Sequence, residues 1–402
     1  MQSKTCYTND KLNHTKSLAV YIHWPFCKNK CPYCDFNSYA RQNIDHAKWF
    51  LAYEQAINYY GPLLKLYTIS SVFFGGGTPS LAKPDTICNV LNTLSKNSTF
   101  SDDVEITLEA NPTSIEISQL ENFKNAGINR VSLGIQSLCE NNLRFLGRTH
   151  SAEEAVLAIK NTTKYFDNYS LDLIYALPNQ SLTSWESELK YAVCLANRHM
   201  SLYQLTIEKN TRFSHLVRLG RFKPMDNELA AELYELTQEI MNKYNLPAYE
   251  VSNHATSRYE CRHNLHYWMY KDYLGIGPGA HSRITLNEQN KELYAFGVTN
   301  ANSDQSKIAS VDVKYPKTWL TQVFKKGHGL AHVQSLELKQ MQVEAALMGL
   351  RLRQGIIKQP YFYDSNIIEL KKLGLLEDVE DRVRLTLKGV LVLDSIIEIL
   401  FA

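Results

Sequence analysis

The sequence lacks a dominant charge, a long apolar run and a dense set of cysteines. Lysine and arginine (43) nearly balance aspartate and glutamate (41) over 402 residues, so the formal charge of +2 does not point to nucleic acid or to an acidic partner. No apolar run is long enough to span a bilayer. The first residues lack the basic start and apolar stretch that mark a signal peptide, so we expect a cytoplasmic protein.

Eight cysteines in a chain of this length do not make a disulfide framework. Three of them, however, stand together at Cys27, Cys31 and Cys34, with the spacing C-x3-C-x2-C and no fourth cysteine nearby. Three thiolates on one short loop suit a [4Fe–4S] cluster whose fourth iron stays open to a non-protein ligand. Zinc is the alternative, with His23 as a fourth ligand. The position of the motif after a first predicted strand favours the cluster.

Short β-rich runs alternate with helix-length segments over the first 200 residues, which predicts βα units and a parallel sheet. The expected strands are 18–24, 71–77, 105–112, 130–137, 170–178 and 201–208, and the expected helices include 46–60, 115–126, 152–165 and 184–196, with Ser118 and Ser151 as N-caps. Six such units fit an incomplete (β/α)6 barrel or an open doubly wound sheet. Polar residues late in successive strands favour the barrel, because the carboxyl ends of barrel strands form the active face.

The pattern changes near residue 300. A helix over 335–353, a helix over 367–373, a hairpin around the turn 378–382 and a helix over 389–400 predict an α+β winged-helix-like domain. Acidic and basic residues are nearly balanced there, so we expect a lid or docking module rather than a nucleic-acid-binding one. The predicted division is a tail (1–16), a core barrel (17–250), a connecting segment (251–302) and a C-terminal domain (303–402).

The cysteine motif, with Tyr33 between its second and third cysteines, resembles that of the radical S-adenosylmethionine (SAM) enzymes. Within that superfamily the chain resembles the branch of the oxygen-independent coproporphyrinogen III dehydrogenase over about residues 17–400. The matching stretches are His23-x-Pro-Phe-Cys27, Phe74-Gly-Gly-Gly-Thr-Pro-Ser80, Leu133-Gly-Ile-Gln-Ser137, Asp172-Leu-Ile-Tyr-Ala-Leu-Pro-Asn-Gln180 and Asp272-Tyr-Leu-Gly-Ile-Gly277.

This resemblance implies that SAM chelates the open iron of the cluster, and that cleavage of SAM yields a 5′-deoxyadenosyl radical. It also implies contacts with SAM. Gly76, Gly77 and Thr78 would lie near the methionine end, Glu109 would receive the ammonium and Arg148 the carboxylate. Gln136 and Asp172 would hold the ribose hydroxyls, and Tyr21 would lie near the adenosyl site.

Two departures separate the chain from the dehydrogenase itself: Phe36 stands where the dehydrogenase has a further cysteine, and only a short segment precedes the first strand. The chain resembles instead the heme-chaperone (HemW) group, whose H-N-x-x-Y motif stands here as His263-Asn-Leu-His-Tyr267. Imidazole and phenolate are both axial heme ligands, so the resemblance implies heme binding at His263 or Tyr267, with His266 and Cys261 as alternatives.

Two functions follow as hypotheses. The first is a heme chaperone that delivers heme to hemoproteins such as respiratory cytochromes while it carries a SAM-bound [4Fe–4S] cluster. For this carrier we also expect a homodimer and peripheral contact with a membrane-bound partner. The alternative is an oxygen-independent coproporphyrinogen III oxidase that performs a radical SAM oxidative decarboxylation.

Overall fold

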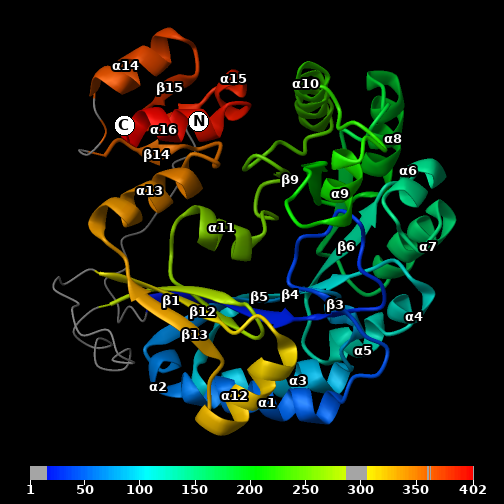
Figure 1. Cartoon of the computed structure of the whole chain (residues 1–402), viewed down its shortest axis with the longest axis vertical. Helices are drawn as coiled ribbons and strands as arrows, with labels where there is room; N and C mark the ends of the chain where they lie inside the picture. The colour runs from blue at the N-terminus through cyan, green and yellow to red at the C-terminus, as the bar shows by residue number, and fades with distance from the viewer. Residues whose placement is uncertain (1–15, 287–305, 360–361, 363, 402) are drawn as a thin grey trace, which may run out of the picture.

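The computed structural model describes residues 16–286, 306–359, 362 and 364–401, and its main feature is one large open sheet (Figure 1). The sheet has the order β13-β12-β11-β10-β1-β4-β5-β6-β7-β8-β9. Its parallel centre consists of β1 (Lys16–Trp24), β4 (Tyr67–Gly76), β5 (Thr99–Ala110), β6 (Arg130–Gln136), β7 (Tyr169–Tyr175) and β8 (His199–Gln204). These are the six predicted strands, and they neighbour one another in chain order, as barrel strands do, rather than in the reversing order of a doubly wound sheet. Because the sheet does not close, the incomplete barrel is confirmed.

Helices between these strands cover the outer face of the sheet and bury its apolar side chains (Figure 1). They are α1 (His46–Tyr59), α2 (Gly61–Leu64), α3 (Pro84–Asn97), α4 (Ser114–Ile117), α5 (Leu120–Asn125), α6 (Glu140–Phe145), α7 (Ala152–Thr162), α8 (Leu182–Leu195) and, after β8, α10 (Asn227–Lys243). The short α9 (Arg212–Arg218), also after β8, instead meets the cysteine loop, where the Phe213 amide donates to the Pro32 carbonyl at 2.9 Å. A 3-10 turn follows β4 at Pro79–Leu81.

Only one of the two predicted helix caps is correct. Ser151 caps α7 and forms a capping box, in which its hydroxyl accepts from the Glu154 amide at 3.1 Å and the Glu154 carboxylate accepts from the Ser151 amide at 2.9 Å. The helix expected over 115–126 is broken into α4 and α5. Because α5 starts after Gln119, Ser118 is not its N-cap.

Strands beyond the predicted six lengthen the sheet at both edges. β9 (Asn253–Ala255) pairs antiparallel with β8, and β10 (Tyr273–Ile276) pairs parallel with β1. β11 (His281–Thr285), β12 (Lys307–Asp312) and β13 (Leu330–Ser335) continue from β10 as an antiparallel ribbon. The sheet therefore runs past residue 303, and we propose that the second unit begins near residue 338 instead.

The antiparallel ribbon is fixed to the barrel by an aromatic contact. Trp319 lies on α12 (Pro316–Lys326), and its ring stacks on Trp49 of α1 with centroids 5.6 Å apart and planes 3° apart. The Trp319 indole N–H donates to the buried Asp312 carboxylate at 2.7 Å. Burial raises the pKa of Asp312 to about 7. This contact explains why β12 and β13 belong to the barrel although they follow it by a hundred residues.

The C-terminal unit has a hydrophobic core of its own, built around Ala346, Leu370, Val383 and Ile396. Its elements are α13 (Leu338–Gly349), β14 (Ile356–Ile357), α14 (Asp364–Lys372), β15 (Leu376–Val379), β16 (Arg382–Leu385), α15 (Leu387–Val390) and α16 (Leu393–Phe401). The predicted order of helix, helix, hairpin and helix is confirmed. The first helix is shorter than expected, and the last is broken into α15 and α16.

One short helix lies on the inner face of the sheet. α11 (Arg262–Trp268) carries the His263–Tyr267 motif and packs on β4, where the His263 ring meets the Ser71 hydroxyl at 2.9 Å (Figure 1). Arg351, just after α13, stacks over Trp268 of α11 at 4.5 Å and pairs with the buried Glu250 at 3.2 Å. The C-terminal unit is thus tied to α11. Among the described helices, none combines the length and apolar character that a membrane crossing requires.

Candidate functional site

The three clustered cysteines lie on a loop that is closed at its base by two short strands. β2 (Phe26–Cys27) pairs parallel with β3 (Tyr39–Ala40), and the Arg41 amide donates to the Cys27 carbonyl at 2.9 Å. Inside the loop, the Lys30 ammonium donates to the Phe36 carbonyl at 2.9 Å and to the Ser38 carbonyl at 3.3 Å. The loop therefore has a defined shape, and it follows β1 as the sequence predicts.

The thiols of this loop are free and differ in exposure. Cys27 is buried, whereas Cys31 and Cys34 are partly exposed. Burial raises the pKa of Cys27 and of Cys34, and the three thiols lie near enough for their charges to influence one another. In the described chain they do not converge into a metal-binding group of three. Their number and chemistry nevertheless suit a cluster bound through three thiolates, which must lose their protons to bind iron.

The structure gives His23 a different role from zinc ligation. Its ring is buried, and Nε2 lies 2.9 Å from the Asn37 carbonyl while Nδ1 lies 3.1 Å from the Tyr21 phenol. Because a carbonyl only accepts, Nε2 carries the proton and Nδ1 accepts from Tyr21. Burial lowers the pKa of His23 to about 4. Both ring nitrogens are therefore occupied, and His23 links Tyr21 to the cysteine loop.

The glycine run after β4 is shaped by close contacts with β1 and the cysteine loop. Gly76 has a φ of +111°, and a Cβ there would lie 2.4 Å from the His23 ring. A Cβ on Gly77 would lie 2.6 Å from the Phe26 carbonyl oxygen. The Thr78 amide donates to that same carbonyl at 2.8 Å. Glycine is required here because the backbone passes directly against its neighbours.

Glu109 and Arg148 are both linked to this glycine turn, Glu109 directly through Gly76 and Arg148 through Asn111. The Glu109 carboxylate accepts from the Gly76 amide at 3.1 Å, and burial, with a smaller contribution from Asp172, raises its pKa to about 7. Arg148 donates to the Asn111 side chain at 2.5 Å, to the Gly134 carbonyl at 2.9 Å and to the Cys31 sulfur at 3.4 Å. An arginine that touches the cysteine loop is well placed for an anion bound beside that loop.

Asn111 and Gln136 complete this edge of the sheet. Asn111 connects Arg148 to Thr78, because its amide nitrogen donates to the Thr78 hydroxyl at 3.2 Å. Gln136 ends β6 with a φ of +68°, and its side-chain nitrogen lies 2.9 Å from where a Cβ on Gly134 would be. Four predicted SAM residues, Gly76, Thr78, Gln136 and Arg148, therefore lie at the carboxyl edge of the sheet close to the cysteine loop.

Asp172 lies deeper than predicted, in the middle of β7 rather than at its end. Its carboxylate accepts from Ser132 at 2.8 Å and from Ser170 at 2.9 Å, and burial raises its pKa. It lines a cavity of about 190 Å³ inside the barrel. The walls of this cavity are Tyr21, Phe73, Glu109, Arg130, Ser132, Asp172, Ser201, Tyr203, His263, Asn264 and Tyr267.

The cavity joins the two predicted sites. Tyr21, Glu109 and Asp172 come from the SAM prediction, and His263 and Tyr267 come from the heme prediction. His263 is buried, and its Nε2 lies 2.8 Å from the Tyr267 phenol while its Nδ1 faces Ser71. Phe73 stacks on the His263 ring with centroids 5.0 Å apart. Burial lowers the pKa of His263 and raises that of Tyr267.

The two alternative heme ligands lie outside this cavity. Cys261 is buried, its pKa is raised to about 12 by burial, and its thiol donates to Glu105 at 3.5 Å. Burial lowers the pKa of His266 to about 4. Neither side chain is among those that line the cavity. The structure therefore brings His263 and Tyr267 together with the SAM residues and leaves Cys261 and His266 aside.

Several polar residues of the cavity wall were not predicted as site residues, namely Arg130 and Ser132 on β6, Ser201 and Tyr203 on β8, and Asn264 on α11. The signal that would have found them is the two-residue period of a strand. Arg130 and Ser132, like Ser201 and Tyr203, stand two positions apart, and residues with that spacing face the same side of a sheet.

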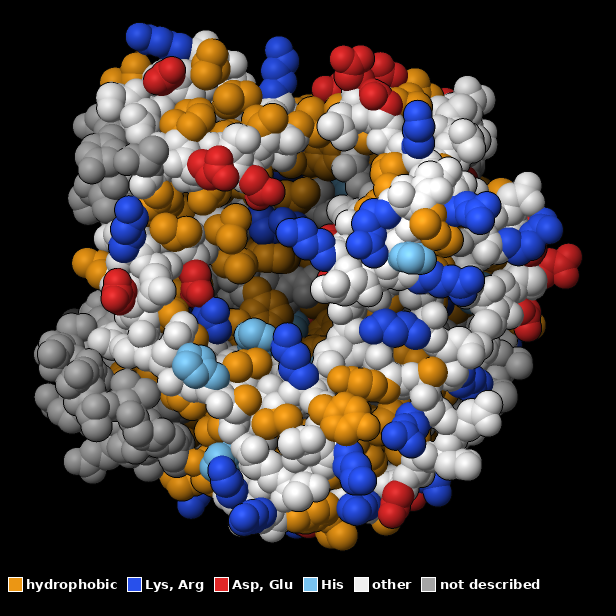
Figure 2. Space-filling view, in the orientation of Figure 1, with side chains coloured by type: hydrophobic (Ala, Val, Ile, Leu, Met, Phe, Trp, Pro, Cys, Tyr) orange, Lys and Arg blue, Asp and Glu red, His pale blue; other side chains and the backbone are white. Residues whose placement is uncertain are grey.

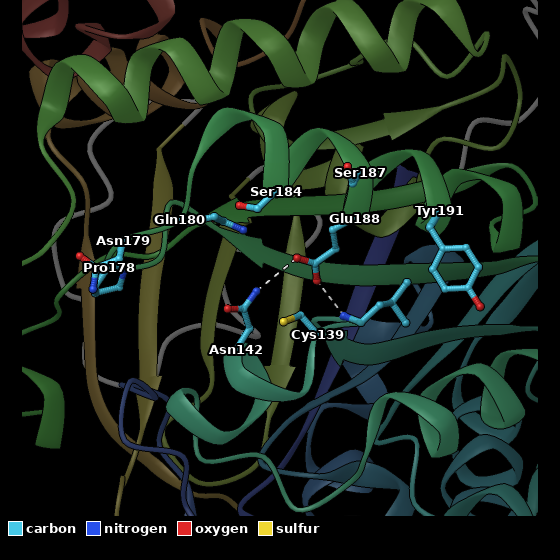
Figure 3. A pocket seen from close by; sticks show the side chains of 10 residues that line it. Cys139, Asn142, Pro178, Asn179, Gln180, Ser184, Ser187, Glu188 and Tyr191 are labelled. Atoms are coloured by element: carbon cyan, nitrogen blue, oxygen red, sulfur yellow. Dashed lines mark hydrogen bonds between the residues drawn. The ribbon is translucent and has the colours of Figure 1, made fainter.

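A second cavity, of about 250 Å³, lies between α6 and α8 on the outer side of the sheet (Figure 3). Glu188 points into it and accepts hydrogen bonds from the Leu138 amide at 2.7 Å and from Asn142 at 3.2 Å. The Ser137 hydroxyl donates to the same carboxylate. These hydrogen bonds fix the turn that follows Gln136, so Glu188 stabilises the edge of the site from the outer side of the sheet.

Comparisons with known proteins agree with this geometry. Residues 21–192 match the radical SAM superfamily. Radical S-adenosyl methionine domain-containing protein 1, mitochondrial, from Danio rerio is 34% identical over 97% of this chain and 88% of its own length. Heme chaperone HemW from Buchnera aphidicola subsp. Schizaphis graminum is 39% identical over 67% of this chain and 70% of its own length.

The fold of the whole chain also has a solved counterpart. Coproporphyrinogen III oxidase (HemN) from Escherichia coli, a radical SAM enzyme, superposes with a TM-score of 0.78 over 97% of this chain and 91% of its own. At 21% identity this likeness establishes the fold alone. Membership implies SAM and a [4Fe–4S] cluster as cofactors. The chain belongs to the radical SAM superfamily, in the group that includes the heme chaperone HemW.

Proposed function

We propose that the protein is a heme chaperone that binds heme and delivers it to acceptor hemoproteins. The observation that carries the proposal is the position of α11, which places His263 and Tyr267 on the wall of the same cavity as Tyr21, Glu109 and Asp172. Relatives of similar sequence bear the name heme chaperone HemW. The H-N-x-x-Y motif thus faces the interior of the barrel rather than packing as an outer helix.

The residues near the cysteine loop would hold SAM on the cluster of Cys27, Cys31 and Cys34. Gly76, Gly77 and Thr78 would offer backbone and hydroxyl groups to its methionine end, and Arg148 would pair its carboxylate. When bound there, the cluster and SAM would supply one-electron chemistry.

Deeper in the barrel, Glu109 would receive the ammonium, because a cation beside this buried carboxylate would favour its charged form. Gln136 and Asp172 would hold the ribose hydroxyls. Tyr21, held by His23, would lie beside the adenosyl group.

Heme would approach from the hollow in the middle of the molecule. Figure 2 shows this hollow between the C-terminal unit and the helices α9 and α10, with hydrophobic side chains on its walls and Lys and Arg side chains at its rim. Apolar walls suit a macrocycle, and cations suit its carboxylates. The inner cavity of about 190 Å³ is smaller than the roughly 300–1,000 Å³ typical of ligand pockets, so the macrocycle would lie across its mouth.

Tyr267 is our first candidate for the iron ligand, with His263 as its partner. His263 uses both ring nitrogens in hydrogen bonds, whereas Tyr267 makes one, to His263. If the phenol donates to Nε2, then Nδ1 carries the proton and donates to Ser71. His263 would then accept the phenol proton as Tyr267 becomes the phenolate ligand.

The acceptor hemoproteins would include respiratory cytochromes, and we propose that the chaperone acts as a homodimer that can contact a membrane-bound acceptor. The relative from Danio rerio is named as mitochondrial. The expected cytoplasmic location remains a prediction.

A paired assay on one anaerobically reconstituted sample tests the proposal. Holo-protein is mixed with an apo-b-type cytochrome, and transfer is followed by the cytochrome's absorption; the same sample is incubated with SAM, reductant and coproporphyrinogen III. We expect heme to appear in the cytochrome and no protoporphyrinogen IX to form. Formation of protoporphyrinogen IX would establish the alternative, coproporphyrinogen III oxidase. The variant Tyr267→Phe should weaken heme binding, whereas Tyr259→Phe, on the loop before α11, should not.

A further inference from the structure

Arg130 is a buried cation whose hydrogen-bonding capacity is almost unused. It is 2% exposed and begins β6 at the deep end of the inner cavity. In the part of the chain that the structure describes, its one ion pair is a contact of 3.9 Å from Nε to Glu105, too long for a hydrogen bond. Among the described residues none accepts a hydrogen bond from its Nε or from its terminal nitrogens. A buried guanidinium in this state is costly unless something else binds it.

Glu105 does not satisfy Arg130, because its nearer oxygen, Oε2, lies 3.9 Å from Nε, beyond hydrogen-bond distance. One of its oxygens accepts from the Cys261 thiol at 3.5 Å and from the His263 amide at 3.3 Å. The ion pair to Arg130 runs from Nε, the inner nitrogen of the guanidinium. The outer fork of Arg130 is therefore left for the cavity, whose wall it forms together with Ser132, Ser201 and Tyr203.

We propose that Arg130 is the anchor of a second carboxylate subsite, which receives a carboxylate-bearing side arm of the ligand inside the barrel. A planar guanidinium fork matches the two oxygens of a carboxylate, and the hydroxyls of Ser132 and Ser201 offer further donors. The inference rests on the proposed function and deepens it, because heme and coproporphyrinogen both carry propionate arms on their rims.

The size of the cavity favours an arm over a whole ligand. At about 190 Å³ the cavity is smaller than the roughly 300–1,000 Å³ typical of ligand pockets. A propionate arm fits this space, and a tetrapyrrole ring does not. Arg130 is also separate from Arg148, which is held against the cysteine loop by Cys31 and Asn111. The two arginines would thus bind two different carboxylates, that of SAM beside the cluster and that of the ligand deeper in the barrel.

Binding of two forms of one macrocycle tests this subsite. The probes are ferric protoporphyrin IX and its dimethyl ester, each titrated into the full-length protein and followed by absorption. For the unaltered protein we expect the free acid to bind about tenfold more tightly or better, as for a charge-assisted hydrogen bond. For Arg130→Gln combined with Glu105→Gln, which removes the buried cation together with the carboxylate of its ion pair, we expect the two probes to bind within about twofold of each other.

The control is Arg262→Gln, which removes a largely exposed arginine of α11 and should keep the preference for the free acid. If the Arg130 variant and the control prefer the free acid over the dimethyl ester to the same extent, the proposal is overturned. The propionates of the macrocycle would then bind the cations at the rim of the hollow. Circular dichroism is used to check that each variant is folded. Arg130→Lys keeps the charge but loses the planar guanidinium, so it should prefer the free acid to an intermediate extent.

A second measurement separates this inference from heme binding itself. Thermal unfolding is compared in propionate and in propionamide at equal ionic strength. We expect propionate to stabilise the unaltered protein more than it stabilises the Arg130 variant, whether or not the protein binds heme. An equal response of both proteins would refute the subsite even if heme binds. If the protein binds no heme but propionate still stabilises it in a way that depends on Arg130, only the chaperone function is refuted.

Discussion

Replacing Gly76 by alanine tests whether contact with His23 shapes the turn after β4. The φ of +111° is strained for any side chain, which costs about 1–3 kcal/mol. The added Cβ would also lie 2.4 Å from a ring that is held on both sides by hydrogen bonds to Tyr21 and Asn37. Overpacking of that kind costs about 1–3 kcal/mol. We therefore expect Gly76→Ala to lower the free energy of unfolding by about 2–6 kcal/mol, a large share of the roughly 5–15 kcal/mol of a typical domain.

Two other glycines separate the two contributions. Gly77→Ala adds a clash of 2.6 Å with the Phe26 carbonyl without a positive φ, so we expect a loss of about 1–3 kcal/mol. Gly220→Ala places an alanine at a φ of +67° with no neighbour to clash with, so we expect a loss of about 1–2 kcal/mol in the free energy of unfolding. The order of destabilisation should be Gly76, then Gly77, then Gly220.

Urea unfolding followed by tryptophan fluorescence measures these losses in the barrel, because all five tryptophans lie at or before Trp319. Equal destabilisation by Gly76→Ala and Gly220→Ala would show that the His23 ring yields to the added methyl. The rigid link from Tyr21 through His23 to the cysteine loop would then be wrong.

Three further outcomes are expected. Alanine at any one of the three loop cysteines should abolish the iron and sulfide that the protein retains after anaerobic reconstitution, whereas Cys194→Ala should not; undiminished iron in all three would refute the cluster. Because the folded pKa of Glu109 is about 7 and the unfolded pKa about 4.5, its contribution to stability is complete below about pH 4.5 and is lost as the pH rises to about 7. In the absence of SAM, the free energy of unfolding of Glu109→Gln should fall by about 3 kcal/mol less over this pH range than that of the unaltered protein. Urea unfolding at several pH values measures the difference, and an unchanged pH dependence would contradict the raised pKa. Arg351→Ala should lower stability by about 2–3 kcal/mol, because it leaves the wholly buried Glu250 without its cation, whereas breaking the exposed pair of Arg384 and Glu377 should cost less than about 1 kcal/mol; equal melting temperatures would count against the Arg351 link.

Much of the barrel could be predicted because its strands carry their own signal. The runs that became β1 and β4–β8 are short, apolar and separated by helix-length segments, so alternation alone indicates a parallel sheet. The extension by β12 and β13 could not be predicted in the same way. It depends on the stacking of Trp319 on Trp49, a contact between positions 270 residues apart that no local pattern reveals.

The edge of the site was easier to predict than its interior. The glycine run and the cysteine spacing are local motifs, and both lie beside each other in the structure. The sequence did not indicate that α11 would turn His263 toward Ser71 of β4, nor that Asp172 would lie in the middle of its strand. Those positions depend on how the chain returns across the inner face of the sheet. Arg130 was missed because it stands at the amino end of its strand, away from the edge where active-site residues gather.

The central claim is that one chain holds both a three-cysteine cluster and heme. The most direct measurement is the absorption spectrum, with iron and sulfide analysis, of anaerobically reconstituted protein that has been incubated with ferric heme and passed through gel filtration. If one chain binds both, we expect one heme retained per chain together with one [4Fe–4S] cluster, and loss of the heme spectrum in Tyr267→Phe. Protein that leaves the column with its cluster but without heme would contradict the claim that this chain binds heme.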